Sequence, residues 1–520
     1  MTPQKLFRSQ NREQPDQFSK KEFWIALVGF TIACLPILFW QLDQPGLRMW
    51  DEARQAVSAL EMSFNHRWLI LYFDGQPDMW SSKPPLLIWC MVFSMKLFGF
   101  NEFAVRLPSA ISALGTATVL VLFGSLYFRR LSAGLISGFV LITTSGFVGE
   151  HVARTGDYDA MLLFWVTLYS ICLFMYANAE LEGRKSKYLL LATIFVTLAA
   201  LTKSIAGVLM IPGFLMYLAH QKQLIKSLTK PQTYLAIIGF VAIISSYYVI
   251  RELQEPGFLQ VVMTYEFGRY GSTLENHNHP ITFYFTQIQK KFTPWFYLLP
   301  FCFFLTQLSH SFKVKQFGKF ALWLCSSYLL IISLSKTKLP WYDAQFYPLA
   351  SIVIGLGCSE ILALVQNIVS EYRTGLLRPK KTIVKYVLIA SLVTLPYANT
   401  FYATIYQNKG LLYTSVNNPR LMYGDYLKHI TRSQPFLERF TVFYNPIIVY
   451  SQPYNAHLLF YSKVLNLDKY SINLKTDREQ LIANEVVLTC DPESSDVIRT
   501  GYKAGSIDSV NNCQTYRIQR

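Results

Sequence analysis

The sequence predicts a polytopic α-helical membrane protein with a small α/β domain at its C-terminus. Hydrophobic residues make up 52% of the 520 residues, and the mean hydropathy is +0.25. Long apolar runs recur along the chain, and many approach the roughly 20 residues that a helix needs to cross a bilayer. The net charge of +16 does not indicate a nucleic-acid-binding protein, because the lysines and arginines are spread over short loops, as expected for cytoplasmic loops.

The apolar runs and the charges between them predict about 11 spans, or up to about 13 if other apolar segments also cross. Residues 1–22 are polar and basic and form a cytoplasmic tail. No small-residue cleavage site follows the first span, so it is an uncleaved signal anchor. Every loop left inside is basic, and the C-terminus lies outside. The spans of this transmembrane domain (23–402) are 23–41, 104–128, 131–150, 160–178, 188–202, 204–219, 232–250, 292–309, 320–335, 345–366 and 382–402.

Two juxtamembrane helices are expected in the first outer loop. Residues 51–64 place apolar side chains at three- and four-residue steps. The segment is short and charged, which predicts an amphipathic helix lying in the membrane interface. Residues 84–99 are apolar but short and begin with two prolines, which favours a juxtamembrane or re-entrant helix. A true span over 84–99 is the alternative, and it would require another boundary to move.

Residues 403–520 lack long apolar runs and predict a small α/β domain outside the membrane. Short apolar stretches between turn signals such as Asn445-Pro446 predict strands at 440–443, 447–450, 458–461 and 486–488. Cys490 and Cys513 lie in this domain, and a disulfide between them is expected because the compartment is oxidising. The other six cysteines lie in or beside apolar runs and are expected to be small buried hydrophobes.

Under this topology the outer loops carry many ionisable residues, which are costly near a bilayer and by default mark a pathway or a binding site. Both signs occur, together with histidines and a tyrosine: Asp51, Glu52, Asp157, Asp159, Glu266, Asp343, Arg54, Lys83, Arg154, Lys203, Arg269, Lys336, Lys338, His277, His279 and Tyr342. A lipid-linked sugar phosphate fits this set. Lys, Arg and Tyr bind the phosphate, a carboxylate accepts the proton of an acceptor hydroxyl, and the spans supply an apolar groove for the tail.

The acids and the first lysine also have structural interpretations. Asp51 and Glu52 could cap the 51–64 helix, since acids favour helix N-termini. Asp157 and Asp159 could cap the next span in the same way. Lys83 stands before two prolines and could be an interfacial anchor whose ammonium reaches water.

The remaining candidates also have a functional and a structural interpretation. Lys203 lies between two abutting apolar runs with few solvated positions, which favours a functional role. Arg269 could be a solvated charge, and Tyr342 an interfacial aromatic residue. The spacing of His277 and His279 permits metal binding, but no third ligand is evident. No cofactor is therefore assigned, and a divalent metal has little support at these two histidines.

Five short motifs follow one another as they do in a known family. They are Asp-Glu-Ala-Arg at 51–54, Lys-Pro-Pro-Leu at 83–86, Arg-Leu-Pro-Ser-Ala at 106–110, 154–159, and Lys-Leu-Pro-Trp-Tyr at 338–342. Together they make residues 20–350 resemble the bacterial branch of the dolichyl-phosphate-mannose–protein mannosyltransferase family. That branch includes the transferase that puts aminoarabinose on lipid A, and it belongs to the C superfamily of glycosyltransferases (GT-C).

The resemblance implies a GT-C fold and an inverting transferase that uses a polyprenyl-phosphate sugar at the outer face of the bacterial cytoplasmic membrane. It implies that Asp51 is the essential aspartate of the first outer loop. Asp159 best matches the aspartate of the second loop, with Asp157 as the alternative, and Glu52 is a further catalytic candidate. The expected donor-phosphate contacts are Lys83, Arg54, Lys203, Arg269, Lys338 and Tyr342.

One departure from the family pattern concerns the residue before the lysine of the Lys-Pro motif. In the aminoarabinose transferases an acid stands there and takes part in a metal site, whereas this chain has Ser82. The departure weakens both a metal site and lipid A as the acceptor. The acceptor stays open between a glycolipid such as lipid A, a glycan and a protein hydroxyl.

Two other functions fit a membrane protein of this kind. A flippase or transporter of lipid-linked sugars would be expected to show repeated halves and polar sites near the middle of the membrane, and neither is evident in the sequence. An O-antigen ligase-like enzyme generally has a large outer loop between spans, whereas the largest outer segment here is C-terminal. No glycine-rich nucleotide-binding pattern occurs. The expected partners are the lipid-linked donor, membrane lipids and the acceptor, without nucleic acid.

Overall fold

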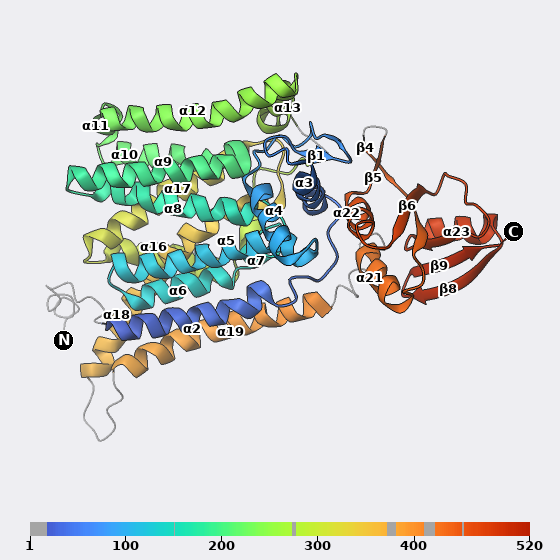
Figure 1. The fold of residues 1–520 in the computed structure, drawn as a ribbon. Helices are drawn as coiled ribbons and strands as arrows, with labels where there is room; N and C mark the ends of the chain where they lie inside the picture. Colours follow the sequence, from blue (N-terminus) through green and yellow to red (C-terminus); the bar gives the residue numbers. More distant parts are fainter. Residues whose placement is uncertain are drawn as a thin grey trace.

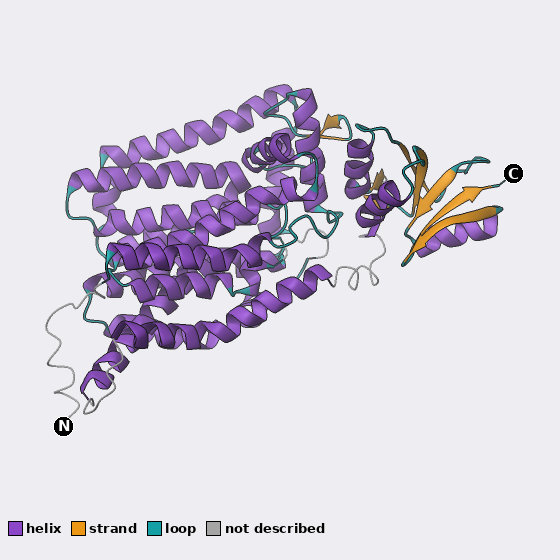
Figure 2. Ribbon diagram, turned by 60° about the horizontal axis from the view of Figure 1, so that its bottom comes forward, coloured by secondary structure: helices purple, strands orange, loops and turns teal. Residues whose placement is uncertain are grey.

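Most of the chain forms a bundle of long helices, and the C-terminal part forms a small sheet with short helices at one end of the bundle (Figure 1, Figure 2). The structure is a computed structural model that describes residues 18–149, 151–272, 277–371, 381–409, 422–449 and 452–519. Most of the predicted N-terminal tail and most of the basic loop before the last span lie outside these residues. Helices α3 and α13 lie at the end that faces the sheet, and α11 lies at the other end (Figure 1).

Eight helices in the described part of the chain are long and apolar enough to cross a membrane. They coincide with eight of the predicted spans, and the protein is a multi-pass membrane protein. They are built from α2 (Lys20–Phe39), α5 (Glu102–Leu122) with η1 (Phe123–Tyr127), α8 (Asp159–Asn178), α9 (Glu182–Lys203) with η2 (Ser204–Val208), α12 (Pro231–Gln254), α17 (Phe312–Leu334), η4 (Pro340–Gln345) with α18 (Phe346–Glu371), and α19 (Lys381–Lys409).

The other three predicted spans coincide with shorter apolar helices, α6 (Leu131–Ile142), α10 (Ile211–His220) and α16 (Trp295–Leu308). Each of the predicted segments therefore holds an apolar helix. The outward side chains of α12 fit a lipid environment, because Leu235 and Ile238 are 70% and 63% exposed and large exposed apolar surfaces are rare on soluble monomers.

Small residues allow the first helices of the bundle to pack closely. A Cβ atom on Gly134 of α6 would lie 2.2 Å from the Ser125 Oγ atom of η1. Close backbone approach over small residues is a common way for helices to associate in membranes. The contact holds α6 against η1, and the second predicted outer loop follows α7 and leads into α8.

The first outer loop contains the two predicted helices, but the first of them packs against protein rather than lipid. Helix α3 (Asp51–Asn65) lies between α4 (Leu86–Phe98) and α22 (Ala456–Leu465). Its apolar residues other than Phe64 are buried, as are the polar Gln55, Ser58 and Ser63. Helix α4 has 13 residues, which agrees with the expectation of a short juxtamembrane helix.

Short elements make up the loops at the two ends of the bundle. The first outer loop also holds a small hairpin of β1 (Tyr72–Phe73) and β2 (Gln76–Pro77). The remaining short helices are α7 (Ser145–Val148), α11 (Leu224–Leu228), α13 (Phe258–Val262), η3 (Met263–Phe267), α14 (Gly268–Gly271) and α15 (Phe283–Lys291).

The C-terminal part is a five-stranded mixed sheet with the strand order β6-β3-β7-β9-β8. Strand β3 is parallel to β6 and β7, and β9 is antiparallel to β7 and β8. The elements are α21 (Tyr423–Ser433), β3 (Arg439–Tyr444), the hairpin of β4 (Ile447–Val449) and β5 (Gln452–Tyr454), α22 (Ala456–Leu465), β6 (Ser471–Thr476), β7 (Val486–Thr489), α23 (Pro492–Gly501), β8 (Ala504–Val510) and β9 (Cys513–Ile518).

The prediction of a strand at 458–461 is wrong, because these residues lie in the helix α22. A short apolar run is compatible with a buried strand or with a buried helix. Here the helix allows Leu458, Phe460 and Tyr461 to be buried together, on a helix that packs on α3. The long-range contact with the first outer loop therefore decides the local structure.

Polar contacts attach the C-terminal domain to the first outer loop and to α5. The Tyr461 hydroxyl donates to Glu102 Oε1 over 2.6 Å and accepts from the Leu47 N–H over 2.7 Å. The Lys428 ammonium of α21 lies 2.6 Å from the same carboxylate. The Trp50 ring, next to Asp51, stacks on Tyr454 of β5 with the ring centres 5.0 Å apart. The domain is therefore held against the segment that carries Asp51.

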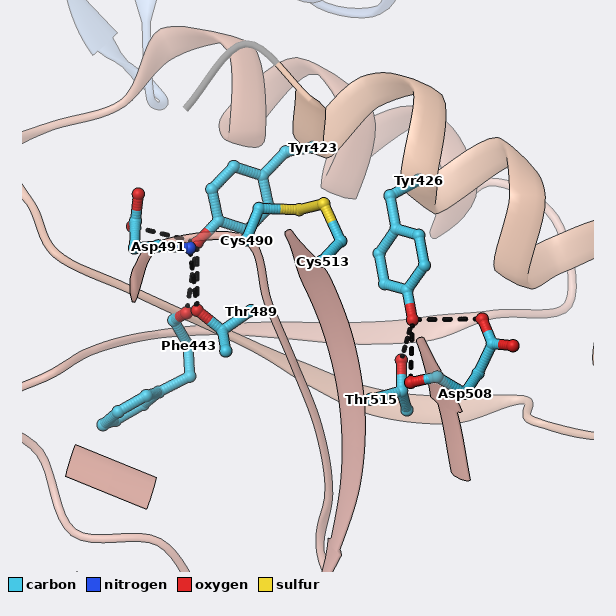
Figure 3. Close-up of a disulfide and its surroundings, with 9 residues drawn as sticks. All are labelled: Tyr423, Tyr426, Phe443, Thr489, Cys490, Asp491, Asp508, Cys513 and Thr515. Carbon is cyan, nitrogen blue, oxygen red and sulfur yellow. Dashed lines mark hydrogen bonds between the residues drawn. A yellow bond between two sulfur atoms is a disulfide. The ribbon is translucent and has the colours of Figure 1, made fainter. Parts of the chain in front are cut away.

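Cys490 and Cys513, the expected pair, form a disulfide that joins the end of β7 to the start of β9 (Figure 3). Both residues are fully buried. The Tyr423 ring of α21 lies beside them, and its hydroxyl donates to the Asp491 carboxylate over 2.9 Å. The bond closes a loop with a sequence separation of 23 residues.

We expect removal of this disulfide to lower the free energy of unfolding of the C-terminal domain by about 2–5 kcal/mol, because the unfolded chain regains conformational freedom. The Cys490→Ala/Cys513→Ala protein would be compared with wild type by chemical unfolding in detergent. Cys90→Ala removes a free, half-buried thiol and serves as the control. Unfolding of the double variant at the wild-type midpoint would contradict a stabilising role for the bond.

Candidate active site

Glu52 belongs to the 51–54 motif, and its carboxylate binds residues of two other motifs, 106–110 and 154–159. Its carboxylate receives Arg106 Nε over 2.6 Å and Arg106 Nη2 over 3.0 Å. It also accepts the N–H groups of Arg48 over 3.0 Å and Gly156 over 2.9 Å. Burial raises the pKa of Glu52, but the Arg106 guanidinium outweighs it and holds the pKa below its usual range. Glu52 is 1% exposed, so it has no room for a substrate and acts as a positioning residue. The sequence analysis had it as a catalytic candidate.

The second outer loop fits closely against α5. A Cβ atom on Gly156 would lie 2.5 Å from Val105 Cγ1, so a larger residue would push the loop away. The Ser109 hydroxyl donates to the Asp157 carbonyl over 2.9 Å. Arg154 donates to the carbonyls of Ile37 and Trp40 near the end of α2. These contacts place the 154–159 motif beside the start of α3.

Asp51 and Asp157 lie together with a histidine that the sequence analysis did not single out. Asp51, His151 and Asp157 each place one carboxylate oxygen or ring nitrogen within 4.8 Å of those of the other two. His151 Nδ1 is 3.3 Å from Asp157 Oδ2, and the His151 ring stacks on Trp341 with the ring centres 3.6 Å apart. Asp51 and Glu52 lie in the first turn of α3, as the helix-capping alternative expects, while the N-cap residue Trp50 makes no side-chain cap hydrogen bond.

Burial and neighbouring charges shift the pKa values of both partners in this cluster. Burial raises the pKa of Asp157, but the neighbouring His151 ring and the Lys203 ammonium outweigh it and lower the pKa of the carboxyl. Burial lowers the pKa of His151, but Asp157 and Asp51 outweigh it and raise the pKa of the imidazole. The cluster therefore places two carboxylates and an imidazole beside the Trp341 ring.

Asp159 and Lys203 form a buried ion pair. The Lys203 ammonium at the end of α9 lies 2.7 and 2.6 Å from the two carboxylate oxygens of Asp159, the first residue of α8. The two side chains are 10% and 7% exposed. Lys203 was predicted to contact a donor phosphate. In the structure its ammonium is paired with Asp159 and also lines the pocket described next.

A pocket opens next to this ion pair. Its polar lining includes Lys83, Asp159, Lys203, Glu266, Arg269 and Tyr342. Trp341, whose ring stacks on His151, also lines it. The pocket therefore adjoins the Asp51, His151 and Asp157 cluster. Its cavity volume of about 60 Å³ is far below the roughly 300–1,000 Å³ of small-molecule sites, so a sugar can enter only when the surrounding side chains move.

Lys83 is the cation of this pocket that no acid neutralises among the described residues. Its ammonium lies 5.3 Å from the centre of the Tyr158 ring. Arg269 Nη1 donates to the Tyr342 hydroxyl over 2.5 Å, and its Nε donates to the Tyr265 carbonyl over 2.7 Å. Lys83, Arg269 and Tyr342 thus present donors to one space although they come from three distant segments.

Glu266 brings a carboxylate to the position where the family pattern has an acid and this chain has Ser82. The Ser82 hydroxyl donates to Glu266 Oε1 over 2.5 Å, and Glu266 is 8% exposed. The acid comes from η3 of the long outer loop, about 184 residues away in sequence. A carboxylate from another loop therefore lies within hydrogen-bond distance of Ser82.

Four other predicted residues do not line the pocket. Arg54 forms an ion pair with Asp78, with two contacts of 2.9 and 2.5 Å, and its guanidinium lies over the Trp80 ring. The Lys338 ammonium donates to the Ser335 carbonyl over 2.6 Å. Nearby acceptors within their own loops explain why Arg54 and Lys338 turn away from the pocket. Among the described residues, Asp51, His151 and Asp157 form a group that could ligate a metal ion, and His277 and His279 do not belong to it.

Sequence comparison relates the chain to membrane sugar transferases. A family model described as dolichyl-phosphate-mannose-protein mannosyltransferase matches residues 82–249. An undecaprenyl phosphate-alpha-4-amino-4-deoxy-L-arabinose arabinosyl transferase from Enterobacter sp. strain 638 is 24% identical over 345 residues, which are 65% of this chain and 60% of that protein. A second such transferase, from Proteus mirabilis, is 28% identical over 59% of this chain and 55% of its own length. The chain spans about three fifths of the length of these relatives.

The structural comparison covers nearly the whole chain. The crystal structure of ArnT from Cupriavidus metallidurans bound to undecaprenyl phosphate superposes with a TM-score of 0.66 at 15% identity, over 95% of this chain and 98% of that one. The chain has the fold of the GT-C glycosyltransferases. The apo form of the same protein gives a TM-score of 0.65. The predicted GT-C fold and the resemblance to the mannosyltransferase and aminoarabinose transferase family are confirmed.

Proposed function

We propose that this GT-C protein is an inverting glycosyltransferase that moves a sugar from a polyprenyl-phosphate donor to an acceptor at the outer face of the cytoplasmic membrane. The observation that carries the proposal is the convergence of Asp51, Lys83 and Arg269 at one end of the helical bundle. Lys83 and Arg269 line one pocket, and Asp51 lies in the cluster that adjoins it. The names of the arabinosyl transferase relatives, which specify an undecaprenyl-phosphate sugar, support this donor class.

The donor phosphate would bind Lys83, Arg269 and Tyr342. Lys83 supplies a charge that no acid among the described residues neutralises, and the fork of Arg269 suits two phosphate oxygens. The Tyr342 hydroxyl accepts from Arg269, which leaves its own proton free for the same phosphate. The polyprenyl tail would lie along the apolar helices, because the pocket also has apolar walls such as Leu162, Ile205 and Leu209.

The reaction follows from the positions of the acids. Asp51 accepts the proton of an acceptor hydroxyl, whose oxygen attacks the anomeric carbon on the face opposite the phosphate. The bond to the phosphate oxygen breaks, its electrons stay on the polyprenyl phosphate, and the configuration is inverted. Asp157 and the Lys203-held Asp159 lie where they stabilise positive charge that develops on the sugar. Lys83 and Arg269 stabilise the leaving phosphate.

The location of the site supports an extracytoplasmic reaction. The end of the bundle that carries the pocket also carries the C-terminal domain (Figure 1), whose disulfide suits an oxidising compartment. In this topology the N-terminus is cytoplasmic and the domain formed by 403–520 is periplasmic. The domain contacts the loop next to Asp51, so we assign it to recognition of the acceptor.

The function is tested by comparing membranes with and without the protein. Mass spectra of lipid A and of surface glycoproteins would show a sugar-sized mass difference in one acceptor class when the protein is active. A vesicle assay with donor and acceptor both confined to the outer side separates transfer from flipping, because a flippase gives no turnover there. Turnover supports the transferase, and its absence in an active preparation contradicts it.

We expect Lys83→Ala to weaken binding of undecaprenyl phosphate by roughly tenfold to hundredfold, because a hydrogen bond to a charged group contributes about 1.5–3 kcal/mol. Binding to the purified protein in detergent would be followed by tryptophan fluorescence. Lys96→Ala is the matched control, since Lys96 is an exposed lysine of α4 whose ammonium lies 5.4 Å from the centre of the Trp68 ring. Equal affinity of the Lys83→Ala and Lys96→Ala proteins would remove Lys83 from the phosphate site.

A further inference from the structure

An exposed tryptophan stands directly before the proposed base. Within residues 46–53, Trp50 is the most exposed side chain, at 44%, and Asp51 is half-buried. The two residues that follow, Glu52 and Ala53, are 1% and 0% exposed. The open surface next to Asp51 in this segment is therefore the Trp50 ring.

The Trp50 ring belongs to an aromatic stack that the C-terminal domain completes. It lies on Tyr454 of β5 with the ring centres 5.0 Å apart and an angle of 19° between the ring planes. Phe73 of β1 stacks on the same tyrosine with the ring centres 5.9 Å apart. The Tyr454 hydroxyl donates to the Trp50 carbonyl over 3.5 Å. Tyr454 is 5% exposed, so the middle of the stack is buried whereas Trp50 remains accessible.

An ion pair within the protein supports the stack and leaves it without a free charge. The Arg54 guanidinium lies 4.4 Å from the centre of the Phe73 ring and 4.3 Å from that of the Trp80 ring. Asp78 neutralises this guanidinium. The stack therefore offers ring faces, rather than a charge, to a ligand.

Asp51 lies close enough to this stack to act on it electrostatically. Burial raises the pKa of Tyr454 to about 12, the Arg54 charge opposes the shift, and the negative charge of Asp51 adds to it. Asp51 also belongs to the cluster with His151, whose ring stacks on a residue that lines the donor pocket. The stack and the donor pocket are therefore both neighbours of the same carboxylate.

A sugar ring has the surface that an exposed tryptophan attracts. The face of an aromatic ring carries partial negative charge, and the C–H groups on one face of a pyranose carry partial positive charge. A serine or threonine side chain of a protein acceptor has no such extended face. An anchor in the membrane interface is the other common use of tryptophan. The Trp50 ring, however, lies flat on the β4–β5 hairpin, which stands between the bundle and the sheet (Figure 1).

We propose that Trp50 is an acceptor subsite and that the acceptor presents a sugar ring to it. The apolar face of that sugar stacks on the exposed face of Trp50 and places one hydroxyl at Asp51. The acceptor is thereby narrowed to a glycolipid or a glycan, and a hydroxyl side chain of a protein is excluded. The subsite needs both domains, because Tyr454 holds the ring. This inference rests on the proposed function and adds the acceptor class to it.

The first test measures transfer by the full-length protein in detergent to three acceptor probes from the same cells. They are the glycolipid fraction, the soluble saccharides released from that fraction, and delipidated surface proteins. We expect the sugar to be attached to a saccharide. Turnover with the glycolipids alone assigns a lipid-bound acceptor, and turnover with the released saccharides shows that the sugar part suffices.

Trp50→Ala is expected to raise the KM for the saccharide acceptor by about tenfold or more, because buried tryptophan contacts are often dominant in recognition. The KM for the donor should stay within about twofold, since the donor pocket is untouched. Trp50→Tyr keeps a ring face and should remain within about threefold of wild type. Trp68→Ala is the matched control, because Trp68 is a 43% exposed tryptophan of the same outer loop.

A spectroscopic measurement tests the contact without turnover and with Trp50 in place. Labelling with 5-fluorotryptophan gives ¹⁹F signals for the 10 tryptophans of the chain, and Trp50→Phe identifies the signal of Trp50. We expect this signal to shift when the glycolipids or the released saccharides are added, whereas the signal of Trp68 should not move. This readout decides if Trp50→Ala fails to fold.

The outcomes separate the subsite from the transferase proposal. Equal acceptor KM values for Trp50→Ala and Trp68→Ala, or transfer to a hydroxyl side chain of a protein, overturn the subsite and leave the transferase in place. Quenching of Trp50 fluorescence by brominated lipids in nanodiscs, measured against Trp50→Phe, makes this ring a membrane anchor and also overturns the subsite. Absence of all transfer by wild type refutes the proposed function. The ¹⁹F signal of Trp50 then decides sugar binding alone, and an unmoved signal overturns it.

Discussion

Asp51→Asn is expected to lower sugar transfer by about 10²–10⁴-fold while the protein still accumulates in the membrane. Asparagine has nearly the same shape, but it cannot accept the proton of an acceptor hydroxyl, and a positioned base contributes rates of this size. Asp51 is half-buried and makes no hydrogen bond or ion pair within the described residues. The substitution therefore removes a reacting group without removing a structural contact.

The measurement is the initial rate of transfer from a polyprenyl-phosphate sugar by purified protein, with folding checked by size-exclusion chromatography. Asp43→Asn is the matched control, because Asp43 is an exposed acid of the same loop. It should keep the wild-type rate. A transfer rate of Asp51→Asn close to that of Asp43→Asn would exclude Asp51 as the base.

Glu52→Gln is expected to lower the free energy of unfolding by about 3–5 kcal/mol, the usual cost of leaving one partner of a buried ion pair without the other. Arg106 is 1% exposed and would keep its charge inside the protein. Its other hydrogen bonds go to the carbonyls of Leu42, Pro45 and Gly46, which cannot replace a carboxylate charge. Sugar transfer should fall as well, because the 154–159 loop loses its charged anchor at Gly156.

Glu61→Gln on the same helix is the control for this variant. Glu61 pairs with Lys463 over 3.1 Å, and the two side chains are 10% and 33% exposed, so the expected loss is below about 1 kcal/mol. Unfolding would be followed by fluorescence during titration with a denaturing detergent. Similar midpoints for Glu52→Gln and Glu61→Gln would show that the Glu52–Arg106 pair does not hold the two loops together.

The helical bundle was predictable because its signals are local. Each apolar run is long compared with a soluble helix, and basic loops alternate with it, so neither signal needs knowledge of distant contacts. Motif order was enough to single out Asp51, Lys83, Arg269 and Tyr342 as one site. The structure brings Lys83, Arg269 and Tyr342 to one pocket and Asp51 to the adjoining cluster.

The errors concern residues whose role depends on a partner far away in the chain. His151 is an isolated histidine in the sequence, and only the fold brings it to Asp51, 100 residues earlier. Glu266 is likewise a single acid in the sequence, and only the fold brings it within hydrogen-bond distance of Ser82. Arg54 follows Asp51 closely in sequence, but Asp78 is a nearer partner for its charge. A conserved pattern of spacing cannot reveal such competition between partners.

The attachment of the C-terminal domain limits how this protein can be divided. Glu102 is 1% exposed only because Tyr461 and Lys428 cover and bind it, and Leu47 depends on the same tyrosine. A shortened chain that ended after the last long helix would expose this acid and release the strand of backbone leading to Asp51. We therefore expect the membrane part alone to lose the contacts that hold this loop, and an exchange of the domain between relatives would require the loop at 42–54 to be exchanged with it.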